Sequence, residues 1–102
     1  MTIEIISIRD CPNHQPAVER VKAVLSSGSL SAEIREILIS DLSQAQSLRF
    51  QGSPTVRVNG MDVEPLSPGA AALSCRIYED GTGLPPESLL KRAIGAASQS
   101  EG

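Results

Sequence analysis

A cysteine and the only histidine of the chain stand three residues apart near its start, in "DCPNH" at residues 10–14. Cys11 follows an apolar run typical of a strand and precedes a run typical of a helix. A sulfur at a helix N-terminus faces unpaired backbone N–H groups and the positive end of the helix dipole, which favour thiolate over thiol. Thiolate is the form that attacks disulfides and binds soft metal ions. Cys11 is therefore the first candidate for chemistry.

His14 has two interpretations at this spacing. As a cation it would stabilise a nearby thiolate, and as a neutral base it would take the proton from the thiol. The alternative is a solvated polar side chain in the first helical turn. His14 also occupies the position where a Cys-x-x-Cys motif has its second cysteine. Cys11 would therefore act as a monothiol, or pass its disulfide to a distant thiol.

The second cysteine, Cys75, lies in "LSCRIY", which we expect to form a strand paired with residues 55–58. In a regular hairpin Cys75 lies opposite about Val58, on the order of 15 Å from Cys11. A disulfide needs Cα atoms within about 7 Å, so we expect Cys75 to be a small residue facing the core. A different register set by the long 61–72 connection is the alternative. We predict no metal cofactor, since a closed zinc site needs about four ligands.

The elements that position these residues alternate between strand-like and helix-like patterns. The first strand is rich in isoleucine, and the helix after it repeats its apolar residues at helical spacing. The Asn59–Gly60 pair is a strong turn signal. The predicted elements are strand 3–8, a helix ending near Leu25, strand 32–39 (for which a helix also fits), helix 44–49, strand 55–58, strand 73–78 and a helix from Pro86 to Ala97.

This order predicts one domain over residues 1–97, followed by a flexible tail at 98–102. A parallel βαβ unit followed by a hairpin and a helix gives an α/β fold of order βαβαββα. We expect one four-stranded mixed sheet with helices on both faces.

Composition excludes several classes of function. The net charge is −3 and aromatic residues make up 2% of the chain, so we expect no nucleic-acid partner. No apolar run approaches the roughly 20 residues of a membrane span. The N-terminus has no basic region before its apolar run, which is unlike a secretory signal. We therefore expect a cytoplasmic protein without a membrane partner.

Two motifs together resemble the thioredoxin-like superfamily in its minimal, glutaredoxin-sized form. They are Cys-Pro-x-x directly after the first strand and "GSPTVRVNG", which opens the third, and the resemblance covers roughly residues 3–97. More narrowly, the chain is similar to small bacterial proteins often named alkylmercury lyase, a hint of thiophilic metals and metal resistance. The resemblance implies a cis Ser53–Pro54 peptide bond, with Pro54 packed beside Cys11. It also implies that the main chain of Ser53 pairs with a bound peptide or thiol.

The resulting prediction is a redox protein that performs thiol–disulfide exchange through one cysteine. The catalytic residues would be Cys11, His14 and Pro54, and the residues that bind glutathione or a partner protein would be Pro12, Ser53 and Thr55. Glutathione would be a co-substrate, and no cofactor is expected. Two alternatives stay open: a module that binds mercury or copper through Cys11 and His14, and a non-catalytic interaction domain of the same fold. Whether the protein is an enzyme, and its oligomeric state, are left open.

Overall fold

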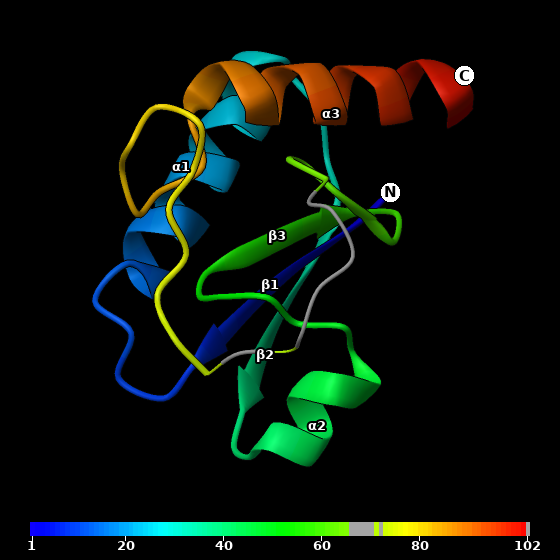
Figure 1. Cartoon of the computed structure of the whole chain (residues 1–102). Coiled ribbons are helices and arrows are strands. Elements are labelled where there is room, and N and C mark those ends of the chain that lie inside the picture. Colours follow the sequence, from blue (N-terminus) through cyan, green and yellow to red (C-terminus); the bar gives the residue numbers. More distant parts are fainter. Residues whose placement is uncertain (66–70, 72, 102) are drawn as a thin grey trace.

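The computed structural model describes residues 1–65, 71 and 73–101. Its architecture is mixed α/β (Figure 1). In chain order the elements are β1 (Thr2–Ile8), α1 (His14–Ser27), β2 (Glu33–Ile39), α2 (Leu42–Ser47), β3 (Thr55–Val58), β4 (Met61–Asp62) and α3 (Glu87–Glu101). The strand prediction for residues 32–39 is confirmed, as are the elements on either side of it.

The strands form one sheet in the order β2-β1-β3-β4. β1 runs parallel to β2 and antiparallel to β3, and β3 runs antiparallel to β4. The predicted four-stranded mixed sheet is therefore confirmed. Because β1 is central, both ends of this strand are held by neighbours, and the turn that follows Ile8 starts from a fixed point.

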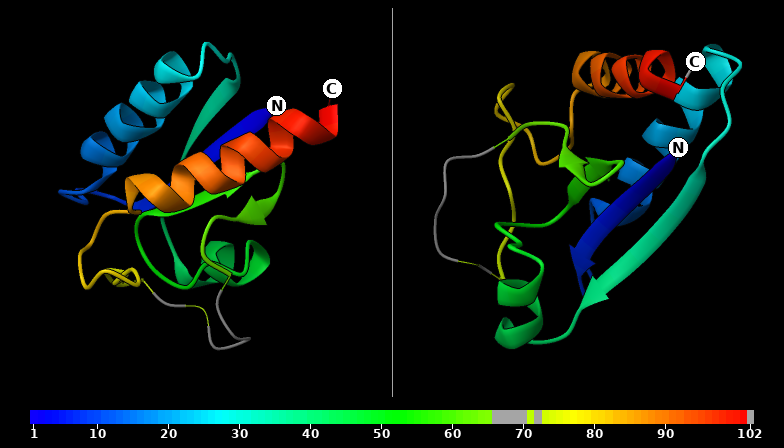
Figure 2. Two further views of the ribbon diagram at one scale, coloured as in Figure 1. Left: turned by 90° about the horizontal axis from the view of Figure 1, so that it is seen from above. Right: turned by 90° about the vertical axis from the view of Figure 1, so that its right-hand side faces the viewer.

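Helices cover both faces of the sheet, as predicted, because β1 alternates its apolar side chains between them. Ile3 and Ile5 pack in one cluster with residues of α1 and α3. Ile6 faces the other way and packs with Ala45 of α2 and Phe50. In the right-hand view of Figure 2, α3 and α2 lie on opposite sides of the sheet.

The β3–β4 hairpin is tighter than the sequence analysis expected. Asn59 and Gly60 have φ values of 50° and 85°, and Val58 pairs directly with Met61 across this two-residue turn. Both central residues with positive φ are characteristic of the turns that match strand twist. The fourth strand is therefore Met61–Asp62, and the prediction of residues 73–78 as the fourth strand is wrong.

The 73–78 segment runs instead along the Ser53 end of β3. It makes one isolated parallel bridge, between Cys75 and Ser53. The predicted position of Cys75 opposite Val58, at the end of β3 away from Pro54, is therefore wrong. The cause is the tight hairpin, which uses Met61 as the partner of Val58 and lets the chain return later at the other end of the strand.

Two further expectations concern residues near the ends of elements. The Ser53–Pro54 peptide bond is cis, as the resemblance implied.

α3 continues past its predicted end at Ala97 to Glu101, so residues 98–101 belong to the helix rather than following it. Within the described ranges, no helix combines the length and apolar character needed to cross a membrane.

Candidate functional site

Cys11 lies in the turn between β1 and α1 and is partly exposed. Its N–H donates to the carbonyl of Ile8 (3.4 Å), and its own carbonyl accepts from the N–H of His14 (3.2 Å). Asn13 is the N-cap of α1, and its side chain makes no capping hydrogen bond. The thiol is therefore carried by a short turn fixed at the end of β1, just before the first residue of the helix.

His14 is the first residue of α1, and its imidazole contacts β1 and β2. Nδ1 lies 2.6 Å from the hydroxyl of buried Ser7, and Nε2 lies 2.7 Å from a carboxylate oxygen of Glu36. An ionised carboxylate only accepts hydrogen bonds, so Nε2 carries a proton, and in the neutral ring Nδ1 accepts from Ser7. Both ring nitrogens thus have partners other than Cys11.

Ser53 is joined to the strand that leads to Cys11. Its hydroxyl accepts a hydrogen bond from the N–H of Ile8 (3.1 Å). Pro54 and Thr55 follow it and are fully buried, and the Thr55 hydroxyl donates to the carbonyl of Gly52 (2.6 Å). The structure thus brings the Ser53–Pro54 motif to the end of β1, at the start of the turn that carries Cys11.

The main chain of Ser53 is already paired within the protein. Its N–H donates to the carbonyl of Ser74 (2.8 Å), and its carbonyl accepts from the N–H of Arg76 (2.9 Å). The carbonyl of Pro54 accepts from the hydroxyl of Tyr78 (2.5 Å). The 73–78 segment therefore occupies the backbone positions that the resemblance assigns to a bound peptide or thiol.

Of the predicted binding residues, Pro12 is exposed in the turn, whereas Ser53 and Thr55 are buried. Cys75 is exposed, so the prediction that it faces the core is wrong. The physical reason is the alternation of the 73–78 segment, in which Arg76 and Tyr78 are buried and their neighbours point outward.

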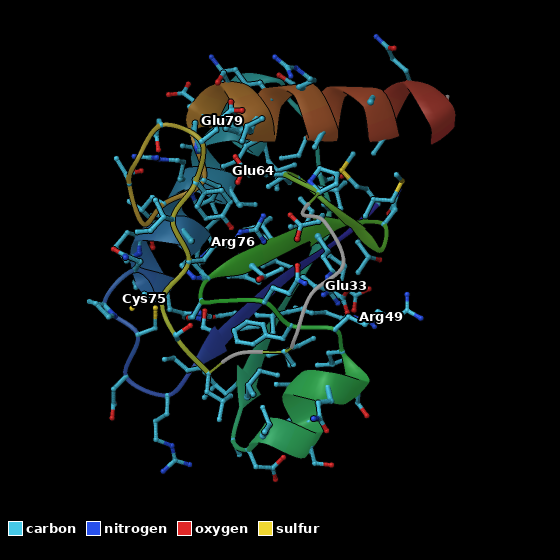
Figure 3. All side chains as sticks on the ribbon, viewed as in Figure 1. Glu33, Arg49, Glu64, Cys75, Arg76 and Glu79 are labelled. Carbon is cyan, nitrogen blue, oxygen red and sulfur yellow. The ribbon has the colours of Figure 1, made fainter. Side chains whose placement is uncertain are left out.

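Arg76 is the main contact of this segment with the sheet, and the sequence analysis missed it. Its guanidinium donates to both carboxylate oxygens of Asp62 (2.8 and 3.0 Å) and to the carbonyl of Glu64 (2.5 Å). It also lies 4.5 Å from the centre of the Tyr78 ring. Burial alone would lower the pKa of Arg76, but the hydrogen bond and charge of Asp62 keep it above its ordinary value. Figure 3 labels Arg76 next to Cys75 and near Glu64.

Gly52 permits the close approach of the two segments. Its φ is +140°, and a Cβ atom placed there would lie 2.7 Å from the Cβ of Arg76. A glycine before "SPT" is therefore the one signal in the sequence that another part of the backbone lies against this site.

Among the described residues, no group of three or more His, Cys, Asp and Glu side chains is arranged to hold a metal ion. The pairing of Cys11 with His14 at a soft metal would require His14 to leave Ser7 or Glu36. A groove of about 650 Å³ lies between the β3–β4 hairpin and α3, and neither cysteine lines it. The candidate site is therefore the surface turn around Cys11 with Ser53 beneath it.

We compared the chain with protein-family models, curated proteins and solved structures, and none of them matches.

Proposed function

We propose that this chain is a thioredoxin-like protein in which Cys11 performs thiol–disulfide exchange as a monothiol. One observation carries the proposal: a partly exposed thiol follows the central strand, and Ser53 of the Ser-Pro pair is hydrogen-bonded to the last residue of that same strand. The order of strands and helices and the position of Pro54 directly before β3 support the fold assignment.

The proposed step is a displacement at sulfur. The Cys11 thiolate attacks one sulfur of a disulfide R–S–S–R, the new bond Cys11–S–S–R forms, and the other half leaves as a thiolate that takes a proton from water. Cys11 is oxidised and the leaving thiol is reduced. A second thiol reverses the step by attacking the mixed disulfide, which regenerates Cys11.

The contacts of Ser53 favour glutathione over an extended peptide as the partner. A peptide that paired with Ser53 would have to displace Ser74 and Arg76 from its main chain. A small disulfide needs only the exposed turn that carries Cys11 and Pro12. In this case Ser53 and Thr55 do not contact the disulfide. Their hydrogen bonds to Ile8 and Gly52 fix the backbone next to the turn.

In this proposal His14 positions the turn and does not act as the base. Its two hydrogen bonds tie the first residue of α1 to β1 and to β2. Since the N–H of His14 also donates to the carbonyl of Cys11, a fixed histidine fixes the end of the turn.

The test is the reaction of the reduced Cys75→Ser variant, in which Cys11 is the only thiol, with oxidised glutathione, followed by mass spectrometry of the digested protein. We expect an adduct on Cys11 that forms faster than an adduct on a cysteine in an unstructured peptide. Cys11→Ser removes it, and Cys11→Ser should retain the wild-type fold because the thiol has no buried partner among the described residues. A Cys11 that reacts no faster than the peptide overturns the proposal.

The soft-metal module and the non-catalytic interaction domain stay predictions. Titration with Cu(I) of the wild type and of Cys11→Ser tests the first, because equal binding by both removes Cys11 as the ligand. Full cellular function of Cys11→Ala would favour the second.

A further inference from the structure

The two cysteines of the chain lie on either side of Ser53. Cys75 pairs with Ser53 in the parallel bridge. On its other side Ser53 accepts a hydrogen bond from the N–H of Ile8, whose carbonyl accepts from the N–H of Cys11. Figures 1 and 2 both place the 73–78 segment and the turn after β1 at the same end of the molecule. The estimate from the sequence, on the order of 15 Å between the two cysteines, assumed a different strand register and therefore does not apply.

Both thiols are accessible to solvent. Cys75 is exposed and Cys11 is partly exposed. Arg76 and Tyr78 point into the protein, so the alternation of the segment directs Cys75 outward together with Leu73 and Ile77, which are exposed. Neither thiol must therefore leave a core to react.

The segment that carries Cys75 is held unevenly. From Arg76 onward it is fixed by ion pairs with Asp62 and by the Tyr78 hydrogen bond to Pro54. Before Arg76, Ser74 accepts one backbone hydrogen bond, from Ser53, and Ala71 packs against the cluster that contains Ile6 and Phe50. A disulfide needs Cα atoms within about 7 Å. Residues 73–75 can adjust toward that distance at the cost of that one bond, while Arg76 remains in place.

We propose that Cys75 is the resolving thiol of Cys11, which takes the part that a second cysteine at position 14 would have had. The inference rests on the proposed function, because it starts from the mixed disulfide of Cys11 with glutathione. The Cys75 thiolate attacks the Cys11 sulfur, the Cys11–Cys75 bond forms, and glutathione leaves as its thiolate. Together the two steps oxidise both cysteines and reduce one molecule of oxidised glutathione to two of glutathione.

The test uses the full chain and oxidised glutathione at low protein concentration, with quenching by acid and mass spectrometry of intact protein and peptides. In the wild type we expect a monomer with an intrachain Cys11–Cys75 link and little Cys11–glutathione adduct. In Cys75→Ser we expect the Cys11–glutathione adduct to persist. A wild type that accumulates the same persistent adduct as Cys75→Ser overturns the inference and leaves the proposed function standing.

A matched control moves the second thiol by one residue. The double variant Cys75→Ser with Ser74→Cys keeps two exposed cysteines but places one of them on the opposite side of the extended segment. It should retain the Cys11–glutathione adduct as Cys75→Ser does, and resolution as fast as in the wild type would contradict a specific role for Cys75. If Cys11 takes up no glutathione even in Cys75→Ser, the proposed function fails, and this inference fails with it.

Discussion

Ser53 pairs with the 73–78 segment and with Ile8, the residue before the turn over residues 9–13, and these two irregular segments are fixed by different means. The turn over residues 9–13 is held to its surroundings by backbone hydrogen bonds to Ile8 and His14. The 73–78 segment is held by a buried guanidinium with two carboxylate oxygens, a main-chain carbonyl and an aromatic ring around it. The first leaves a sulfur at the surface, and the second covers the Ser53 main chain and Pro54.

The two segments therefore have different roles: the turn exposes a thiol that can react, and the 73–78 segment is attached to the sheet. An accessible thiol needs a turn with little packed over it, whereas an extended segment without a full strand partner needs a strong local contact to stay ordered. In this chain Arg76 provides that contact, because it is 3% exposed and bridges the segment to Asp62 in β4. Substitutions in the two regions should therefore have different consequences.

The largest expected effect on stability is that of Arg76→Met, in the 73–78 segment. Removing the cation leaves Asp62 without its partner beside a buried surface, which should lower the free energy of unfolding by about 3 kcal/mol. Urea denaturation followed by circular dichroism measures the loss. The matched control is Arg35→Met, whose ion pair with Glu33 is exposed, and it should show no measurable change. Similar losses in both variants would mean that the 73–78 segment does not depend on Arg76.

A smaller effect is expected at the reactive turn, for His14→Ala. The buried hydroxyl of Ser7 loses its partner, so the free energy of unfolding should fall by about 1–2 kcal/mol. The rate of Cys11 glutathionylation in the still-folded variant should fall less than about tenfold, because the ring nitrogens bond to Ser7 and Glu36 and His14 acts only by holding the turn.

The control for this variant is Gln15→Ala, which removes an exposed hydrogen bond to Glu19 and should change neither quantity. A tenfold or greater fall in the glutathionylation rate of folded His14→Ala, on the order of 1.4 kcal/mol in activation free energy, would restore the role of His14 as a base.

The smallest effect concerns Tyr78→Phe. Loss of the hydroxyl that donates to Pro54 should lower the free energy of unfolding by about 1 kcal/mol at neutral pH. Burial raises the pKa of Tyr78 far above its ordinary value, while in the unfolded chain tyrosine titrates at about 10. The stability that this difference contributes is complete below pH of about 10 and is lost as the pH rises further, because the unfolded state then releases the proton first.

Urea denaturation at a series of alkaline pH values should therefore show a steeper loss of stability in the wild type than in Tyr78→Phe. Equal slopes would show that the hydroxyl is exposed in solution, and that the 73–78 segment does not cover Pro54 as the structure has it.

The sequence predicted the part of the fold that depends on periodicity. Isoleucine content identified β1, helical spacing α1 and alternation β3, whereas β2, whose pattern also fits a helix, was predicted from the order of the elements around it. The position of Pro54 before β3 came from the motif itself. The Asn59–Gly60 turn was also identified, but the strand after it was not, because Met61–Asp62 is too short to show a pattern. The long connection was then taken as part of the hairpin, and the partner of Val58 was placed too late in the chain.

The second feature that the sequence could not predict was which side chains of the 73–78 segment point into the protein. An alternating run has two possible inward faces, and hydrophobicity favours the one with Leu73, Cys75 and Ile77. The protein instead buries Arg76 and Tyr78, because the cost of burying Arg76 is offset by Asp62, an acidic residue that belongs to another strand. Such compensation across the sheet is invisible in the local pattern, and the position of Cys75 depended on it.

The buried ring of Tyr78 also gives the protein an optical property. The chain contains one tyrosine and no tryptophan, so near-ultraviolet emission comes from this residue. Because the ring lies against the guanidinium of Arg76 and its hydroxyl is bonded to Pro54, its fluorescence reports on one contact at one place. Separation of the 73–78 segment from Pro54 during unfolding can therefore be followed in real time without a dye, through the fluorescence of Tyr78.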